Sequence, residues 1–347
     1  MSGDAGPPAA ERLHAESLVL DLHAHGPGFV PQPFRTAWDV VTCTGPAECE
    51  LATGTDAVVA AAVGDPVVTR CYLGRGAWDA VEAQLARVER QTRSAGATIA
   101  LTADDLVRAQ AAGRAAVLLG VEGADALGAD VDNVDRWHER GIRLVGLVHL
   151  GDNQLGSTCL PWRQYVRRSP RSPRTGAGLS PIGRRVVARM NRVGIVVDVA
   201  HADSTTLFDV VDAATAPVVS SHSGARALQD FPRYLTDDEL RAVAATGGVV
   251  GLWPYRSRHH GVRDLSALAA HARHIADTVG PEHLALGTDT NGIPAAACDY
   301  QGPRDLPKLT GALLAVGFDD DEVAGILGIN ALRVLRQVEQ HAHQPPS

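Results

Sequence analysis

The sequence predicts an α/β fold, a single TIM-type (β/α)8 barrel, and three observations indicate it. Short apolar runs rich in Val, Ile, Leu and Ala alternate with segments of helical periodicity, as expected of parallel strands buried on both faces. A chain of 347 residues that is 45% hydrophobic can bury a large core, and α/β barrels of this length form one domain. No compositional shift or internal repeat marks a boundary. The eight strand candidates are residues 17–20, 56–63, 115–121, 142–148, 195–199, 217–219, 247–253 and 284–288.

The ends of the chain are expected to lie outside the barrel. Residues 1–14 are rich in Gly, Pro and Ala and predict a flexible leader, and residues 341–347 predict a flexible tail. The barrel domain then covers 15–340, with additional C-terminal helices at about 305–316 and 319–338.

Charge and composition exclude several classes of partner. A net charge of −8 and a pI near 5.9 argue against a nucleic-acid or membrane-surface partner. The N-terminus lacks the pattern of a signal peptide, and no apolar run reaches the roughly 18 residues of a membrane span. The five cysteines have no CxxC spacing and are odd in number. We therefore expect reduced thiols in a cytoplasmic protein.

The first strand candidate runs into Asp21-Leu22-His23-Ala24-His25. Side chains two residues apart point to the same side of an extended chain, so both imidazoles can reach one cation. The triplet is common by chance and carries weight only in combination with other ligands.

The next strands are also followed by polar side chains. Helical periodicity over 78–93 separates the second strand from the third, which ends at Glu122. A carboxylate at this position either caps the next turn or binds a ligand. The fourth strand ends at His149.

Residues 163–178, RQYVRRSPRSPRTGAG, are basic, rich in Pro and Ser and without periodicity. They are either a mobile surface loop or a lid over an anionic substrate, and the sequence leaves both interpretations open.

The segment 194–222 organises the rest of the chain. Its two apolar runs lead to His201 and His222, and residues 204–214 between them have helical spacing, with Asp203 or Ser204 as the N-cap. This is a βαβ unit with a histidine beyond each strand. In parallel α/β folds this end of the strands is where ligands bind.

Clear N-terminal signals mark the neighbouring helices. Ser180 and Pro181 begin the helix over 180–193, and Thr236 caps the helix over 236–246. After a further helix over 265–279, the eighth strand ends at Asp289.

Together, the strand ends predict a site for two divalent metal ions, with zinc favoured. Imidazole and carboxylate ligands suit zinc and its neighbours, a carboxylate can bridge two ions, and a nearby aspartate can shuttle the proton of the attacking hydroxide. The six candidate ligands are His23, His25, Glu122, His201, His222 and Asp289.

The chain resembles the renal (membrane) dipeptidases of the amidohydrolase superfamily over roughly residues 17–338. The resemblance is densest in GLSPIGRRVVARMNRVGIVVDVAHAD, APVVSSHSGARAL, FPRYLTDDELRAVAATGGVVGL, HLALGTDTNG and LGINALRVL. It implies a (β/α)8 barrel that binds two zinc ions, hydrolyses dipeptides and forms a homodimer.

Carried over to this chain, the resemblance implies roles for individual residues. The first metal falls to His23 and His25, the second to His201 and His222, and the bridge to Glu122. Asp289 corresponds to the catalytic or ligating aspartate and His149 to a histidine that contacts substrate and tetrahedral intermediate. Arg233, in FPRYL, corresponds to the arginine that binds the substrate carboxylate, a task that suits a guanidinium. Tyr255 is assigned to substrate binding as well.

The chain departs from the family pattern around the site. The usual His-x-Asp is His23-Ala24-His25, which replaces an anionic ligand by a neutral one and should lower the pKa of a bridging water. The SHxS after the fifth strand is AHAD, and the Arg-Asn pair is Arg-Tyr, with Tyr234. Asn291 stands for an aspartate, and the second strand lacks aromatic residues.

These observations leave three functions to compare. The first is a zinc-dependent dipeptidase, in which Asp289 shuttles the proton. The second is a divergent amidohydrolase that acts on a non-peptide amide, lactone or conjugate in a small-molecule pathway, which the departures favour. The third is a non-catalytic metal-binding protein, which the retained aspartate disfavours.

Overall fold

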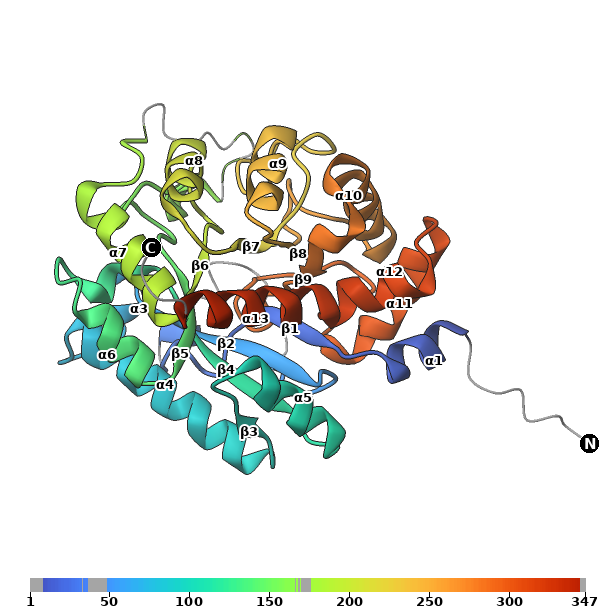
Figure 1. Ribbon diagram of the computed structural model, residues 1–347, viewed down its shortest axis with the longest axis horizontal. Coiled ribbons are helices and arrows are strands. Elements are labelled where there is room, and N and C mark those ends of the chain that lie inside the picture. Colours follow the sequence, from blue (N-terminus) through green and yellow to red (C-terminus); the bar gives the residue numbers. More distant parts are fainter. Residues whose placement is uncertain are drawn as a thin grey trace, which may run out of the picture.

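The computed structural model describes residues 9–32, 34–36, 49–165, 167, 169 and 176–343, and it has the barrel that the sequence predicts (Figure 1). Eight parallel strands are hydrogen-bonded in chain order, and pairing of the second strand with β4 and of the first with β9 closes the ring. These strands are β1 (Leu20–Ala24), β2 (Ala57–Val63), β4 (Ala116–Glu122), β5 (Ile142–Gly146), β6 (Val196–Asp198), β7 (Val218–Ser223), β8 (Val250–Leu252) and β9 (Leu284–Leu286).

A ninth strand, β3 (Thr98–Ile99), pairs with the beginning of β4. Neither this strand nor helix α5 (Ala103–Ala111), which follows it, was expected from the sequence. Two residues are too few to show an alternation pattern, and α5 is marked mainly by its capping box at Thr102 and Asp105.

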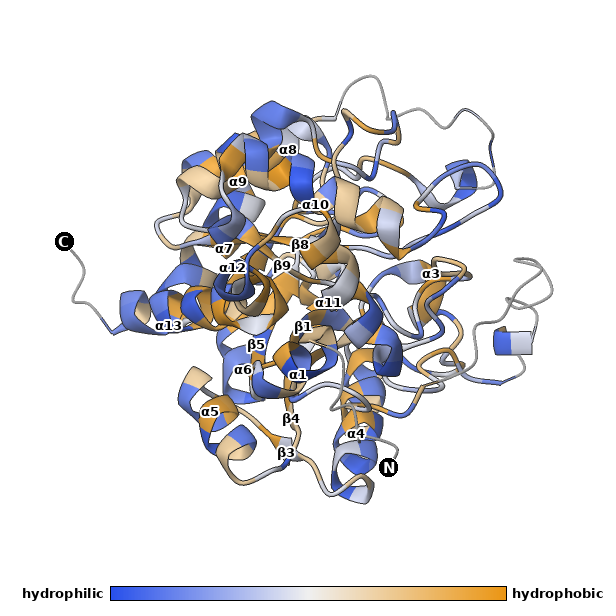
Figure 2. Ribbon diagram, turned by 90° about the vertical axis from the view of Figure 1, so that its right-hand side faces the viewer, coloured by the Kyte–Doolittle hydropathy of each residue, from blue (hydrophilic) through white to orange (hydrophobic). Residues whose placement is uncertain are grey.

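The helices pack around the strands. Figure 2 shows hydrophobic and hydrophilic residues interleaved along helices such as α4 and α13, as expected when one helix face is on the barrel. Besides α5 they are α1 (Ala9–Glu16), α3 (Pro66–Thr69), α4 (Ala77–Ser94), α6 (Asn133–Glu139), α7 (Pro181–Val193), α8 (Ser204–Ala213), α9 (Asp237–Ala245), α10 (Leu265–Val279), α11 (Leu306–Ala315), α12 (Asp320–Ala324) and α13 (Asn330–Ala342).

The caps predicted at the helix starts are present. Ser180 accepts a hydrogen bond from the Gly183 amide at the start of α7, and Thr236 forms a capping box with Glu239 on α9. Of the two cap candidates for α8, the structure selects Asp203, whose side chain accepts from the Thr206 amide.

The chain ends differ from the expected boundaries. Residues 9–14, expected in a flexible leader, belong to α1, where His14 Nδ1 lies 2.9 Å from the hydroxyl of Thr310 on α11. The helix expected over 319–338 is instead α12, a π-helical turn at Gly325–Ile329 and α13, which continues to Ala342. The remainder of the expected leader and most of the tail lie outside the described residues.

Helix α13 lies across the barrel in Figure 1 and closes the end at which the strands begin. Its Leu332, Leu335 and Val338 pack in one cluster with Leu20 and Ala57, and each fully buried leucine contributes about 1.5–3 kcal/mol. Because this end is filled with apolar side chains, polar groups can gather only at the other end, where the strands finish.

The sequence predicted no membrane-spanning segment and reduced cysteines, and both can be examined in the described residues. No helix within them has the length and hydropathy to cross a membrane. Four cysteines are described, and three of them, Cys71, Cys159 and Cys298, are free thiols; the fourth is Cys49. The fifth, Cys43, lies outside the described part of the chain.

Candidate metal centre

Glu122, the last residue of β4, lies at the centre of the predicted ligands. Its Oε1 is 3.0 Å from His201 Nε2, 3.4 Å from His23 Nε2 and 3.5 Å from His222 Nε2. Its Oε2 is 3.4 Å from His25 Nε2. One carboxylate therefore faces imidazoles from three separate parts of the barrel, the geometry expected of a bridging ligand.

Asp289 completes the predicted set. Its Oδ1 lies 3.4 Å from His25 Nε2 and 4.0 Å from His23 Nε2, and its Oδ2 accepts a hydrogen bond of 3.1 Å from Trp253 Nε1. Asp289 and His201 both have positive φ, 53° and 68°, a backbone conformation that aspartate and histidine tolerate better than bulky residues. Such strain is typical of functional sites.

His149 lies on the other side of Glu122, with its Nε2 3.3 Å from Oε2. Its Nδ1 makes a short hydrogen bond to Asp65, a buried carboxylate that also accepts from the amides of Val67 (2.6 Å) and Val68 (3.3 Å). Asp65 is a site residue that was not predicted. It follows β2 in Gly64-Asp65-Pro66, so the rule that found the other site residues could have found it.

Hydrogen bonds to the backbone fix His25. Its Nδ1 is 2.9 Å from the carbonyl of Ala61, which can only accept, so Nδ1 carries a hydrogen and Nε2 faces the carboxylates. The side-chain amide of Asn291 donates hydrogen bonds to the backbone carbonyls of His25, at 2.7 Å, and Cys49, at 3.1 Å. The departure at Asn291 therefore supports the loop behind His25.

Burial and neighbouring charge set the protonation states. Burial alone would raise the pKa of Glu122, but the imidazoles of His149 and His23 lower it well below its usual range. Burial lowers the pKa of His201 and His222 well below the usual value. Burial would also lower the pKa of His25, but hydrogen bonds to Asp289 and Glu122 raise it to about 10. The cluster thus keeps a carboxylate ionised beside two neutral imidazoles.

The donor set fits divalent metal ions. Three groups each offer ligand atoms within 4.8 Å of one another, and together they contain all six predicted ligands and His149. His23 Nε2 is buried without a hydrogen-bond partner among the described residues, and the Nε2 atoms of His201 and His222 are 3.0 Å apart. A buried nitrogen without a partner and two nitrogens that converge on each other suit bound cations.

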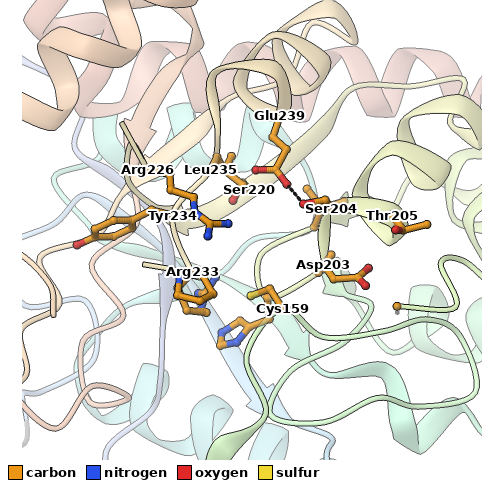
Figure 3. A pocket seen from close by; sticks show the side chains of 15 residues that line it. Cys159, Asp203, Ser204, Thr205, Ser220, Arg226, Arg233, Tyr234, Leu235 and Glu239 are labelled. Carbon is orange, nitrogen blue, oxygen red and sulfur yellow. Dashed lines mark hydrogen bonds between the residues drawn. The ribbon is translucent and has the colours of Figure 1, made fainter. Parts of the chain in front are cut away.

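Arg233 lies beside this cluster in the wall of a cavity of about 140 Å³, shown in Figure 3. Arg233 is only 2% exposed, and its guanidinium carbon lies 4.7 Å from the centre of the Trp253 ring. One guanidinium nitrogen donates a hydrogen bond of 3.3 Å to the carbonyl of His222. Its Nε has no partner among the described residues. His201 also lines the cavity, which therefore adjoins the cluster of candidate metal ligands.

Tyr255 was expected to bind substrate, but it is not among the residues that line this cavity. It is buried and stacks on Trp253 with ring centres 4.3 Å apart. Tyr255 therefore packs behind Trp253, the ring on which Arg233 lies. Tyr234, the other departure in this region, does line the cavity.

The basic segment 163–178 is described only in part. Residues 166, 168 and 170–175 lie outside the described chain, so the choice between loop and lid stays a prediction. Tyr165 is described, and its hydroxyl lies 3.4 Å from His201 Nδ1. The segment therefore starts beside the candidate metal centre.

Comparison with known proteins agrees with this geometry. The model of the membrane dipeptidase family (peptidase family M19) matches residues 9–347. The dipeptidase tcpJ of Claviceps purpurea is 32% identical over 69% of this chain and 55% of its own length, and the dipeptidase aclJ of Aspergillus oryzae is 32% identical over 66% and 53%. The chain thus spans about half the length of these relatives.

Solved structures show the same fold. A metallopeptidase from Rhodobacter sphaeroides, liganded with a phosphinate mimic of the dipeptide L-Ala-D-Ala, has a TM-score of 0.78 at 23% identity, and the match covers 93% of this chain and 100% of that one.

Proposed function

The chain belongs to the membrane dipeptidase family, peptidase family M19, and we propose that it is a dipeptidase that binds two zinc ions. One observation carries the proposal: Glu122 lies among five imidazoles and close to Asp289, while the buried cation of Arg233 lines a cavity next to the same cluster. This combination offers metal ligands and a carboxylate-binding group in one place.

The residues divide into two ligand groups around Glu122. His23, His25 and Asp289 would hold one ion, His201 and His222 the other, and Glu122 would bridge. When bound, the ions supply Lewis acidity and activate a water molecule at neutral pH. His25 gives the first group a neutral imidazole where the family has an aspartate.

The other side chains bind the substrate and move protons. The hydrogen bond from Trp253 orients the Asp289 carboxylate at the edge of the site, where Asp289 would take the proton of the attacking water and pass it to the leaving amine. Burial would lower the pKa of His149, but the carboxylates of Glu122 and Asp65 raise it. In its protonated form His149 donates from Nδ1 to Asp65 and from Nε2 to the oxygen that gains charge during attack. Arg233 binds the substrate's terminal carboxylate.

The substrate class follows from these groups. A free carboxylate for Arg233 and a small cavity of about 140 Å³ favour dipeptides over longer chains. The named relatives from Claviceps and Aspergillus are dipeptidases, and the Rhodobacter protein was solved with a mimic of L-Ala-D-Ala, so a test needs dipeptides of both stereochemistries. A homodimer and a cytoplasmic location stay predictions.

The test compares zinc-loaded wild type with Glu122→Gln on a panel of L,L- and L,D-dipeptides. Losing the bridging charge should cost several kcal/mol of transition-state stabilisation, a loss on the order of a thousandfold in kcat. Glu339→Gln is the matched control, because Glu339 is half-buried on α13, where it accepts from the Ala103 amide. Equal turnover by wild type and Glu122→Gln would overturn the proposal.

A further inference from the structure

A buried serine hydroxyl lies directly below the candidate metal centre. Ser221 Oγ, on β7, is 2.6 Å from Asp198 Oδ2, 2.9 Å from His222 Nδ1 and 3.5 Å from His23 Nδ1. All four residues are at most 1% exposed. The serine therefore connects a carboxylate at the end of β6 to two of the candidate ligands.

The direction of each hydrogen bond follows from what the groups can donate. Asp198 Oδ1 accepts from the amides of Ala200 and Ser221, both at 2.9 Å, and Oδ2 accepts from the Ser221 hydroxyl. These three hydrogen bonds stabilise the charge of the Asp198 carboxylate against its burial, and an ionised carboxylate can only accept, so the single hydroxyl hydrogen of Ser221 points to Asp198. The serine oxygen then has only lone pairs to offer its other neighbours.

An imidazole that meets such an oxygen must be the donor. His222 therefore carries its hydrogen on Nδ1, and its Nε2 lone pair faces Glu122 at 3.5 Å and His201 Nε2 at 3.0 Å. His23 is held in the same sense at the longer distance of 3.5 Å. Its buried Nε2 has no hydrogen-bond partner among the described residues, as expected of a lone pair reserved for a cation.

We propose that Asp198 and Ser221 form a tautomer lock, a pair of positioning residues that keep His222, and more weakly His23, in the form that binds a metal through Nε2. The pair touches neither substrate nor metal and acts only through the ring nitrogens. The inference rests on the metal binding in the proposed function. It goes further by assigning the selection of the ligand tautomer to one carboxylate and one hydroxyl.

The decisive variant is Asp198→Asn, which keeps the shape of the side chain and reverses the lock. The asparagine Oδ1 can still accept the two amides, but its Nδ2 would donate to Ser221 Oγ at the position of Oδ2. The serine hydrogen would then turn to His222 Nδ1 and leave the hydrogen of that ring on Nε2. Zinc affinity should fall by about 100-fold, the upper end for residues that orient ligands.

Ser221→Ala tests the relay itself. Without the hydroxyl, neither tautomer of His222 is enforced, and zinc affinity should fall by about 10-fold. In the double variant the asparagine has no serine to act on, so the loss should equal that of Ser221→Ala alone.

Asp21→Asn is the matched control. Asp21 is also a fully buried carboxylate in the barrel, where it accepts from the amides of His23 (3.1 Å) and Thr288 (2.9 Å) and from the Thr288 hydroxyl (2.5 Å). Among the described residues it has no hydrogen bond to a ring nitrogen. Its zinc affinity should stay within about threefold of wild type.

The tautomer is read directly in the metal-free protein from the nitrogen resonances of ¹⁵N-labelled histidine, with His222 assigned by its loss in His222→Gln. Wild type should show Nδ1 protonated, Asp198→Asn should show Nε2 protonated, and Asp21→Asn should resemble wild type. Zinc affinity is measured by competition with a chelating dye on the same samples.

The outcomes separate this inference from the proposed function. If His222 keeps one tautomer in wild type, Asp198→Asn and Ser221→Ala, and zinc affinity is unchanged, the lock is overturned while dipeptidase activity can stand. If the tautomer switches but wild type hydrolyses no dipeptide, the lock stands and the proposed function fails. Should Asp198→Asn not fold, Ser221→Ala decides, because an unchanged His222 tautomer population and zinc affinity would overturn the lock.

Discussion

The buried guanidinium of Arg233 gives the sharpest prediction about the substrate. This cation is stacked on Trp253, contacts the carbonyl of His222 at 3.3 Å and has an unpaired Nε among the described residues. A buried cation with incomplete pairing is costly unless a ligand completes it. Arg233→Met keeps much of the stem's packing and removes only the charge and the donors.

The magnitude follows from the hydrogen bonds that a bound carboxylate would make. Each hydrogen bond to a charged group contributes about 1.5–3 kcal/mol, and the two bonds of a bidentate grip are not fully additive. A loss of about 3–4 kcal/mol corresponds to roughly 100–1,000-fold in kcat/KM. Folding should not suffer, because a partly paired buried charge is replaced by an apolar side chain.

The assay compares each dipeptide with its C-terminal amide, which lacks the carboxylate. In wild type, kcat/KM should be roughly 100–1,000-fold higher for the acid than for the amide. Arg233→Met should lose this preference and hydrolyse the amide with the kcat/KM of wild type. Arg273→Met is the matched control, because Arg273, on α10, also places its guanidinium carbon over an aromatic ring, 4.5 Å from the centre of Phe318. The reasoning is refuted if Arg233→Met keeps kcat/KM for the acid within threefold, or loses acid and amide equally.

Three further predictions concern protonation and positioning. Asp65→Asn should lower kcat by about 10–100-fold with zinc content unchanged, because His149 loses a charged hydrogen-bond partner. Steady-state kinetics gives kcat and metal analysis gives the zinc content. A loss of zinc from Asp65→Asn would contradict this positioning role. Burial lowers the pKa of His271 to about 4, so the unfolded chain binds a proton below about pH 6.5 that the folded protein refuses. The contribution of His271 to the free energy of unfolding should therefore decline by up to about 3 kcal/mol as the pH falls from 6.5 to 4. In urea unfolding, the stability of His271→Gln should depend less on pH than that of wild type. The same pH dependence in both proteins would exclude this contribution. Because the pKa of His25 is raised to about 10 without metal, zinc binding near pH 8 should release its proton, and zinc affinity should rise with pH. Calorimetry in two buffers counts the protons released on zinc binding, and His25→Asp should release fewer than wild type. Equal numbers of released protons would contradict this prediction.

The strand ends could be predicted from the sequence because two simple rules coincide there. Apolar β-branched runs locate the strands, and the fold brings the residues that follow them to one end of the barrel. His23, His25, Glu122, His201, His222 and Asp289 were found in this way, and the structure brings all six together. The rule needs no knowledge of side-chain orientation.

Other parts of the site depend on orientation, which the sequence pattern does not contain. Asp198 and Ser221 read as ordinary positions in or beside buried strands, and only their distances to the imidazoles show a connection. Arg233 was singled out only by resemblance, since its burial against Trp253 depends on how the loop after β7 folds. Tyr255 was assigned without such geometry and lies against Trp253 instead of lining the cavity.

A zinc titration of metal-free protein tests most directly whether this chain is a dipeptidase that needs two zinc ions, because bound zinc and dipeptide hydrolysis are followed in the same sample. Two equivalents of zinc should bind, hydrolysis of at least one dipeptide should rise with zinc loading, and a chelator should abolish it. Two bound zinc ions without hydrolysis of any L,L- or L,D-dipeptide would contradict the proposed function and favour an amidohydrolase with a non-peptide substrate. Failure to bind zinc would contradict the proposed metal centre itself.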